Sequence, residues 1–110
     1  MQRDEVRLRH MLDAAEEAVS FMADRTRADL DTDSMLALAM VRLLEIIGEV
    51  ANAVTDETQQ KNPQIPWRQI MGTRNRLIHG YYDVDMDIVW QIVKQDLPPL
   101  ITNLEEMING

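Results

Sequence analysis

The segment Ser34–Asp56, SMLALAMVRLLEIIGEVANAVTD, determines what kind of protein this chain can form. Its apolar residues recur at intervals of three and four, which is the spacing of one face of an α-helix. They are Leu36, Ala39, Met40, Leu43, Ile46, Ile47, Val50 and Val54, with Leu44 and Ala51 beside them. A face of this width packs against more than one neighbour. We therefore expect a central helix with other helices around it.

A second helix is expected before this central helix, and a connecting segment is expected on each side of it. Before it, Arg3–Asp24 has the pattern of an amphipathic helix, and the charged stretch Thr26–Asp33 reads as a connection rich in N-cap residues. After it, two prolines and an asparagine in QQKNPQIP (Gln59–Pro66) predict a loop.

The second half of the chain predicts further helices. We expect a third helix at Trp67–His79 and a fourth that starts at the N-cap residues of DVDMD (Asp83–Asp87). Pro98 and Pro99 should end or kink it before a short final helix. No segment shows the strict alternation of a β-strand. The predicted fold is an all-α, antiparallel bundle of four to five helices, with residues 1–110 as a single domain.

The composition is that of a folded protein, with 45% hydrophobic and 27% charged residues in 110. The absence of cysteine fits a reducing cytosol. The charged N-terminus does not resemble a secretory signal, and no apolar run is long enough to span a membrane. We expect a cytoplasmic protein.

Charge is distributed unevenly along the chain. The net charge is −8, yet no Asp or Glu lies between Glu57 and Asp83. This acid-free segment contains RNRLIHGYY, Arg74–Tyr82. The overall negative charge argues against long-range attraction to nucleic acid, but it leaves room for a local anion site.

Arg74 interrupts the apolar stripe of the third predicted helix, because it lies one heptad after Trp67. A charge at a core position must be paired, reach solvent, or serve an interface or a site, since burial of an unpaired charge is costly. One interpretation is purely structural, with Arg74 paired to Glu45 or Glu49. The other is functional, and the two are compatible.

His79 lies four residues after Asn75, so the two would share a helix face. Arg74 and His79 would be separated by about 140° around a regular helix. Either the helix ends near Gly80 and His79 swings out, or a second copy of the chain completes the site, as a two-fold dimer would allow.

These residue types suit RNA cleavage. A histidine can exchange protons with a ribose 2′-hydroxyl or a 5′-oxygen, an arginine can hold the phosphate, an asparagine can orient either group, and a tyrosine can stack on a base. Two distant histidines and no cysteine make a poor transition-metal set, so we expect no metal and no cofactor.

The motif and its flanks resemble a known family. RNRLIHGYY resembles the R-x4-H-x-Y signature of HepT-like toxins, a branch of the HEPN superfamily, with Arg74, His79 and Tyr81 at the signature positions and Asn75 as the polar residue after the arginine. The flanking segments LLEIIGEVAN and NPQIPWRQIMGTRNRLIHGYYDVDMDIVWQIVKQDLP resemble the family's second helix and its third and fourth helices.

The resemblance implies a homodimer with a composite Arg74/His79 site and metal-independent endoribonuclease activity. It also implies a toxin whose antitoxin, the nucleotidyltransferase MntA, transfers AMP to the motif tyrosine, here Tyr81. Gly80 departs from the Asp or Glu of many relatives, and Tyr82 offers a second acceptor.

Three residues outside the signature, Arg76, Glu45 and Glu49, are expected to support the site or the interface. Two other functions stay open at this stage. One is a non-catalytic binding or regulatory partner of a nucleotidyltransferase, and the other is a purely structural helical dimer.

Overall fold

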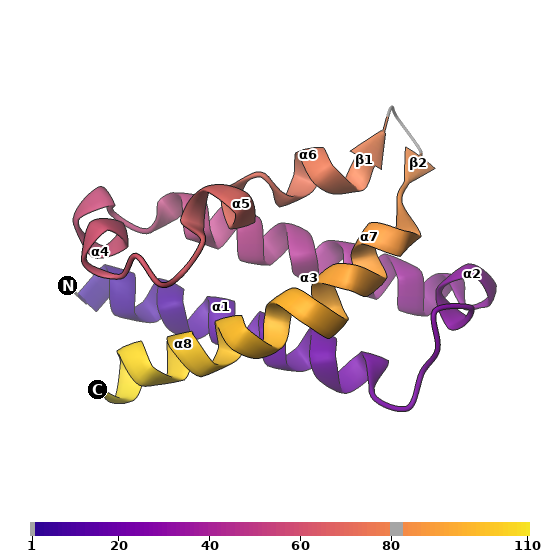
Figure 1. The fold of residues 1–110 in the computed structure, drawn as a ribbon, viewed down its shortest axis with the longest axis horizontal. Coiled ribbons are helices and arrows are strands. Elements are labelled where there is room, and N and C mark those ends of the chain that lie inside the picture. Colours follow the sequence, from indigo (N-terminus) through magenta and orange to yellow (C-terminus); the bar gives the residue numbers. More distant parts are fainter. Residues whose placement is uncertain (1, 80–82) are drawn as a thin grey trace.

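Two long helices, α1 (Gln2–Met22) and α3 (Ser34–Ala53), pack against each other and run in opposite directions (Figure 1). The computed structural model describes residues 2–79 and 83–110. The one-turn helix α2 (Asp29–Thr32) lies in the predicted connection. Asp33 then begins α3, because its side chain accepts a hydrogen bond from the Leu36 amide at 3.1 Å. The predictions of both long helices are confirmed.

The central helix ends earlier than expected, and a short helix follows it. Val54 and Thr55 are extended, and the Thr55 hydroxyl accepts from the Thr58 amide to start α4 (Asp56–Lys61). The prediction of a loop from Gln59 is therefore wrong for residues 59–61. The threonine cap outweighs the loop composition that follows it.

A buried carboxylate ties α1 to this new helix. Asp4 accepts hydrogen bonds from the hydroxyls of Thr55 at 2.6 Å and Thr58 at 2.5 Å, and from the Thr55 amide at 3.2 Å. These bonds, led by the Thr55 hydroxyl, lower the pKa of Asp4 to about 2. Asp4 is therefore charged and buried, and its hydrogen bonds satisfy it.

The third predicted helix is divided in two, as α5 (Trp67–Met71) and α6 (Thr73–Leu77). Gly72 separates them, and the Thr73 hydroxyl donates to the Ile70 carbonyl oxygen at 2.6 Å. Glycine is a poor helix former, and a threonine hydroxyl that bonds the preceding turn competes with the regular pattern. The expectation of one helix at 67–79 is therefore wrong.

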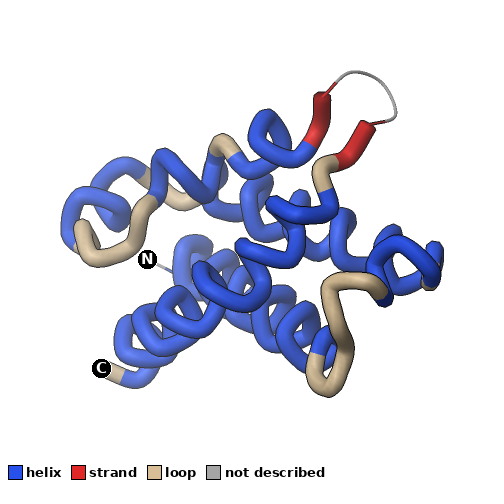
Figure 2. Tube along the Cα trace, turned by 45° about the vertical axis from the view of Figure 1, so that its right-hand side comes forward, coloured by secondary structure: helices blue, strands red, loops and turns tan. Residues whose placement is uncertain are grey.

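A two-residue ladder follows α6 and was not predicted. β1 (Ile78–His79) pairs antiparallel with β2 (Asp83–Val84), with His79 opposite Asp83 (Figure 2). Each strand is too short to show an alternating pattern. The ladder places the end of α6 beside the start of the last helical segment.

That last segment is a continuous helical path of three parts: α7 (Met86–Gln91), the π-helix η1 (Ile92–Asp96) and α8 (Leu97–Asn109). Pro98 and Pro99 lie in the first turn of α8, directly after the π-helical turns. Two consecutive residues without an N–H leave carbonyl oxygens of the preceding turn without a regular helical partner, which fits the change from π-helical to α-helical hydrogen bonding at this point. The prolines therefore coincide with a change of helix type and do not end the path.

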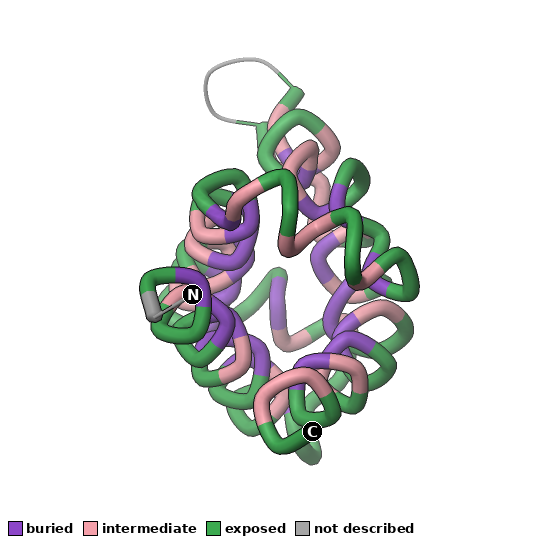
Figure 3. Tube along the Cα trace, turned by 90° about the vertical axis from the view of Figure 1, so that its left-hand side faces the viewer, coloured by how far each residue is buried: buried purple, intermediate pink, exposed green. Residues whose placement is uncertain are grey.

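The core lies between α1, α3 and the last segment, where the buried residues face inward (Figure 3). Its largest fully buried apolar side chains are Met11, Met22, Met40, Leu44, Ile65, Leu77, Val89, Val93 and Leu104. The all-α bundle predicted from the sequence is confirmed. Among the helices that the structure describes, none is long and apolar enough to cross a membrane.

Candidate active site

The break at Gly72 changes which residue of α6 faces the core. Thr73 is buried, whereas the Arg74 side chain is 76% exposed. A regular helix from Trp67 would place Arg74 in the core stripe, as the sequence predicts. Of the outcomes considered for a charge at that position, the structure shows that Arg74 reaches solvent.

Arg74 keeps only a loose contact with α3. Its Nε atom lies 4.0 Å from Oε2 of Glu45, one of the two partners named from sequence. The other named partner is Glu49, and its Oε1 atom lies 3.4 Å from Nη1 of Arg42 instead. A pair at 4.0 Å whose arginine is largely in solvent contributes little to stability. The guanidinium can therefore bind an anion without breaking a strong ion pair.

His79 lies outside α6, in the short strand that follows it. Because α6 ends at Leu77, His79 belongs to β1 and its side chain is 59% exposed. This agrees with the alternative in which the helix ends and the histidine swings out, although the helix ends two residues earlier than expected. The expectation that Asn75 and His79 share a helix face is wrong for the same reason. Both side chains are exposed.

Asp85 lies beside His79 and was not among the candidate site residues predicted from the sequence. Its Oδ2 atom lies 3.7 Å from Nε2 of His79, while Oδ1 accepts from the amides of Asp87 at 3.0 Å and Ile88 at 3.2 Å. The sequence named the DVDMD segment only as a source of N-caps. The contact with His79 depends on the β1–β2 ladder, for which the sequence carried no signal.

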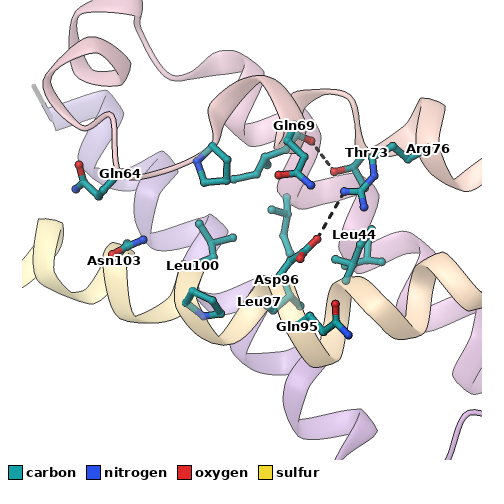
Figure 4. Close-up of a pocket in the computed structure, with 15 residues that line it drawn as sticks. Leu44, Gln64, Gln69, Thr73, Arg76, Gln95, Asp96, Leu97, Leu100 and Asn103 are labelled. Carbon is teal, nitrogen blue, oxygen red and sulfur yellow. Dashed lines mark hydrogen bonds and ion pairs between the residues drawn. The ribbon is translucent and has the colours of Figure 1, made fainter.

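Arg76 lies on a different side of α6 from Arg74. Its Nη1 atom is 3.6 Å from Oδ2 of Asp96 on η1, across a cavity of about 190 Å³ between α5–α6 and η1–α8 (Figure 4). The floor of this cavity is apolar, and Gln64, Gln69, Gln95 and Asn103 contribute polar groups. Arg76 therefore lines this cavity and does not lie beside Arg74, so any support that it gives the site would come from the cavity side.

The remaining motif residues, Gly80, Tyr81 and Tyr82, lie outside the described residues. The acceptor role of Tyr81 stays a prediction. Within residues 2–79 and 83–110, no three His, Asp or Glu side chains gather as metal ligands.

Comparison with known proteins identifies the family. Residues 11–107 match the family described as HepT-like, Ribonuclease HepT-like, so the chain belongs to the HepT-like ribonuclease family. This match confirms the resemblance carried by RNRLIHGYY and its flanks.

Individual relatives agree with this assignment. The chain is 34% identical over 95 residues to "Putative RNase MJ1380" of Methanocaldococcus jannaschii, covering 86% of this chain and 87% of that protein. It is 35% identical over 95 residues to "Probable ribonuclease HepT" of Thermococcus cleftensis, covering 83% and 86%. No solved structure gives a significant match.

Proposed function

We propose that this chain is an endoribonuclease, the toxin of a toxin–antitoxin pair, and that Arg74 and His79 carry the reaction. The observation that supports this most directly is that both side chains are exposed, Arg74 near the start of α6 and His79 in β1 just after its end, within the residues matched to the ribonuclease family. An arginine and a histidine in such a position can bind a phosphate and move a proton.

In the proposed reaction, a neutral His79 imidazole removes the proton from a ribose 2′-hydroxyl. The 2′-oxygen then bonds to phosphorus, the bond from phosphorus to the 5′-oxygen breaks, and a protonated imidazole gives its proton to the leaving oxygen. Arg74 stabilises the charge that builds on the phosphoryl oxygens. The products are a 2′,3′-cyclic phosphate and a 5′-hydroxyl, and the step needs no metal.

The reaction uses one imidazole as base and one as acid, which a homodimer would supply. The exposed face of α3 supports such a dimer. Met35 is 83% exposed and Leu38 is 70% exposed, and Arg42, Glu45 and Glu49 continue the same face at intervals of three and four. Glu45 on this face contacts Arg74, so a two-fold interface there would bring two motifs together.

The dimer is tested by sedimentation. Leu38→Glu should convert a dimer to a monomer and remove cleavage, whereas Thr102→Glu on the exposed side of α8 should change neither. A monomeric wild type that still cleaves RNA would contradict the composite site.

The nuclease itself is tested on purified protein with RNA in EDTA. We expect cleavage that leaves 2′,3′-cyclic or 3′-phosphate ends, and its loss in His79→Ala. His10→Ala is the matched control, because His10 is the only other histidine in the chain and lies on α1. Cleavage retained by His79→Ala would contradict the assignment.

The regulatory part of the proposal is a nucleotidyltransferase antitoxin of the MntA type that transfers AMP to Tyr81 in the cytoplasm. The added bulk and negative charge would exclude an RNA backbone from Arg74 and His79. Coexpression with the cognate nucleotidyltransferase should raise the intact mass by whole AMP units. Tyr81→Phe should prevent the first addition, while Tyr82→Phe should not. Modification without any nuclease activity of the free protein would favour the regulatory-partner function instead.

A further inference from the structure

Three hydrogen bonds hold Asp85, two of them to its carboxylate and one from its backbone amide. Its Oδ1 atom caps α7 through the amides of Asp87 and Ile88, and its own amide donates to the Leu77 carbonyl oxygen at 2.8 Å. Two residues before it, Asp83 pairs with His79 in the ladder. The position of the carboxylate is therefore fixed relative to the end of α6, and Oδ2 remains to face the His79 ring at 3.7 Å.

We propose that Asp85 is a positioning residue for His79. It holds the ring with Nε2–H toward Oδ2 and leaves Nδ1 free to take the proton of the 2′-hydroxyl. The proposal rests on the proposed nuclease function. The tautomer of a neutral histidine is set by the hydrogen bond that one ring nitrogen makes, so a carboxylate beside Nε2 selects the other nitrogen as the base.

The distance of 3.7 Å is longer than a hydrogen bond, which requires about 2.7–3.2 Å. Catalytic hydrogen bonds are often long without substrate and shorten in the reacting complex. Because Oδ1 is already anchored, a small rotation of the imidazole is enough to close the remaining gap. His79 is the exposed partner and is the one with room to move.

The neighbouring acidic residue has a different role. Asp87 accepts a hydrogen bond from Arg27 Nε at 2.7 Å and is turned toward the α1–α2 connection. Removing the Asp87 charge and removing the Asp85 charge each take one negative charge from the same segment. Asp87→Asn is therefore a matched control.

The kinetic test uses two variants that keep the helix cap. Asparagine and serine cap helices about as well as aspartate, so Asp85→Asn and Asp85→Ser should both fold, which thermal unfolding can check. Serine is too short to reach His79. We expect kcat to fall about tenfold in Asp85→Ser with KM for RNA unchanged, the low end of the loss seen when a group that orients a metal-binding histidine is removed.

The two remaining variants make the kinetic test decisive. In Asp85→Asn the single side-chain oxygen stays in the cap, so the NH2 group faces Nε2 and favours the opposite tautomer. The kcat of Asp85→Asn should therefore fall at least as far as that of Asp85→Ser, and Asp87→Asn should match the wild type. An equal loss in Asp87→Asn, or wild-type kcat in Asp85→Ser, would overturn the proposal.

A second measurement does not depend on nuclease activity. The chain has two histidines, so the nitrogen-15 spectrum of the imidazoles contains two rings, with His10 as an internal reference. With both rings neutral, we expect the His79 signals to show Nε2–H in the wild type. They should shift in Asp85→Ser while those of His10 stay in place. Unchanged His79 signals would refute the contact, whereas shifted signals in a protein that cleaves no RNA would refute only the proposed function.

Discussion

The Thr73 hydroxyl donates to the Ile70 carbonyl oxygen at 2.6 Å, and this turn lies directly against Gly48 of α3. A Cβ atom on Gly48 would lie 3.0 Å from that carbonyl oxygen and 3.6 Å from Thr73 Cβ. The absence of a side chain at position 48 therefore lets the α5–α6 turn approach α3 closely, and this approach sets where Arg74 emerges.

Gly48→Ala should force this turn outward. We expect a loss of about 1–3 kcal/mol in the free energy of unfolding, as for other overpacked sites, together with reduced RNA cleavage. Urea unfolding and kcat measure the two effects. Gly72→Ala is the control: its Cβ would lie 3.4 Å from the Arg68 carbonyl oxygen, and its φ of −88° suits any residue. If Gly72→Ala cost as much as Gly48→Ala, the close approach would not be the cause.

The two arginines of α6 should differ in their effect on catalysis. Arg74→Ala should lower kcat by about 10²-fold or more, the size expected for a lost transition-state donor. Arg74→Lys should recover only part of this, because an ammonium cannot form the guanidinium's two parallel bonds. Arg76→Ala removes the contact with Asp96 at 3.6 Å and should affect stability more than kcat. Equal losses of kcat at both positions would contradict the different placements of the two side chains.

Asp4 predicts how stability changes with pH. Its pKa is lowered in the folded state from 3.8 to about 2, so its contribution is complete above pH 4 and is lost as the pH falls through about 2. The shift corresponds to about 2 kcal/mol at neutral pH. Asp4→Asn should lower the free energy of unfolding by a similar amount at pH 7 and remove this acid dependence. Glu5→Gln, which affects an exposed pair with Arg9, should do neither. Denaturant titrations from pH 2 to 7 measure both.

Arg27 joins the α1–α2 connection to α7 through Asp87 at 2.7 Å and also contacts Asp31 at 3.1 Å. The hydrogen bonds that Arg27 donates to Asp87 and then to Asp31 raise the pKa of Arg27, so it stays charged. Because the Asp87 side chain is exposed, a double-mutant cycle of Arg27→Gln and Asp87→Asn should give a coupling of about 0.2–1 kcal/mol. The coupling should shrink in 1 M salt. A salt-independent coupling would contradict an exposed ion pair.

The sequence predicted the parts of the fold that depend on long apolar patterns. Spacing alone located α1 and α3, because each runs for about five turns or more with a continuous apolar face. It did not predict the break at Gly72, since a single glycine within a helical pattern is often tolerated. Arg74 and His79 were identified as a pair, but their exposure follows from that break and from the helix end at Leu77.

Short-range features of two to six residues were the ones missed. The Thr55 cap starts α4, and this helix runs into the segment whose prolines and asparagine predicted a loop. The ladder that brings Asp85 to His79 contains two residues in each strand. Patterns of this length carry too few side chains to distinguish a strand from a turn.

The hydrogen bonds that Asp4 accepts from Thr55 and Thr58 join residues 51 and 54 positions apart in the chain. Closing a chain segment of that length costs conformational entropy, so we expect these bonds to form after α1 and α3 have paired. We therefore expect Asp4→Asn to accelerate unfolding and leave the folding rate nearly unchanged.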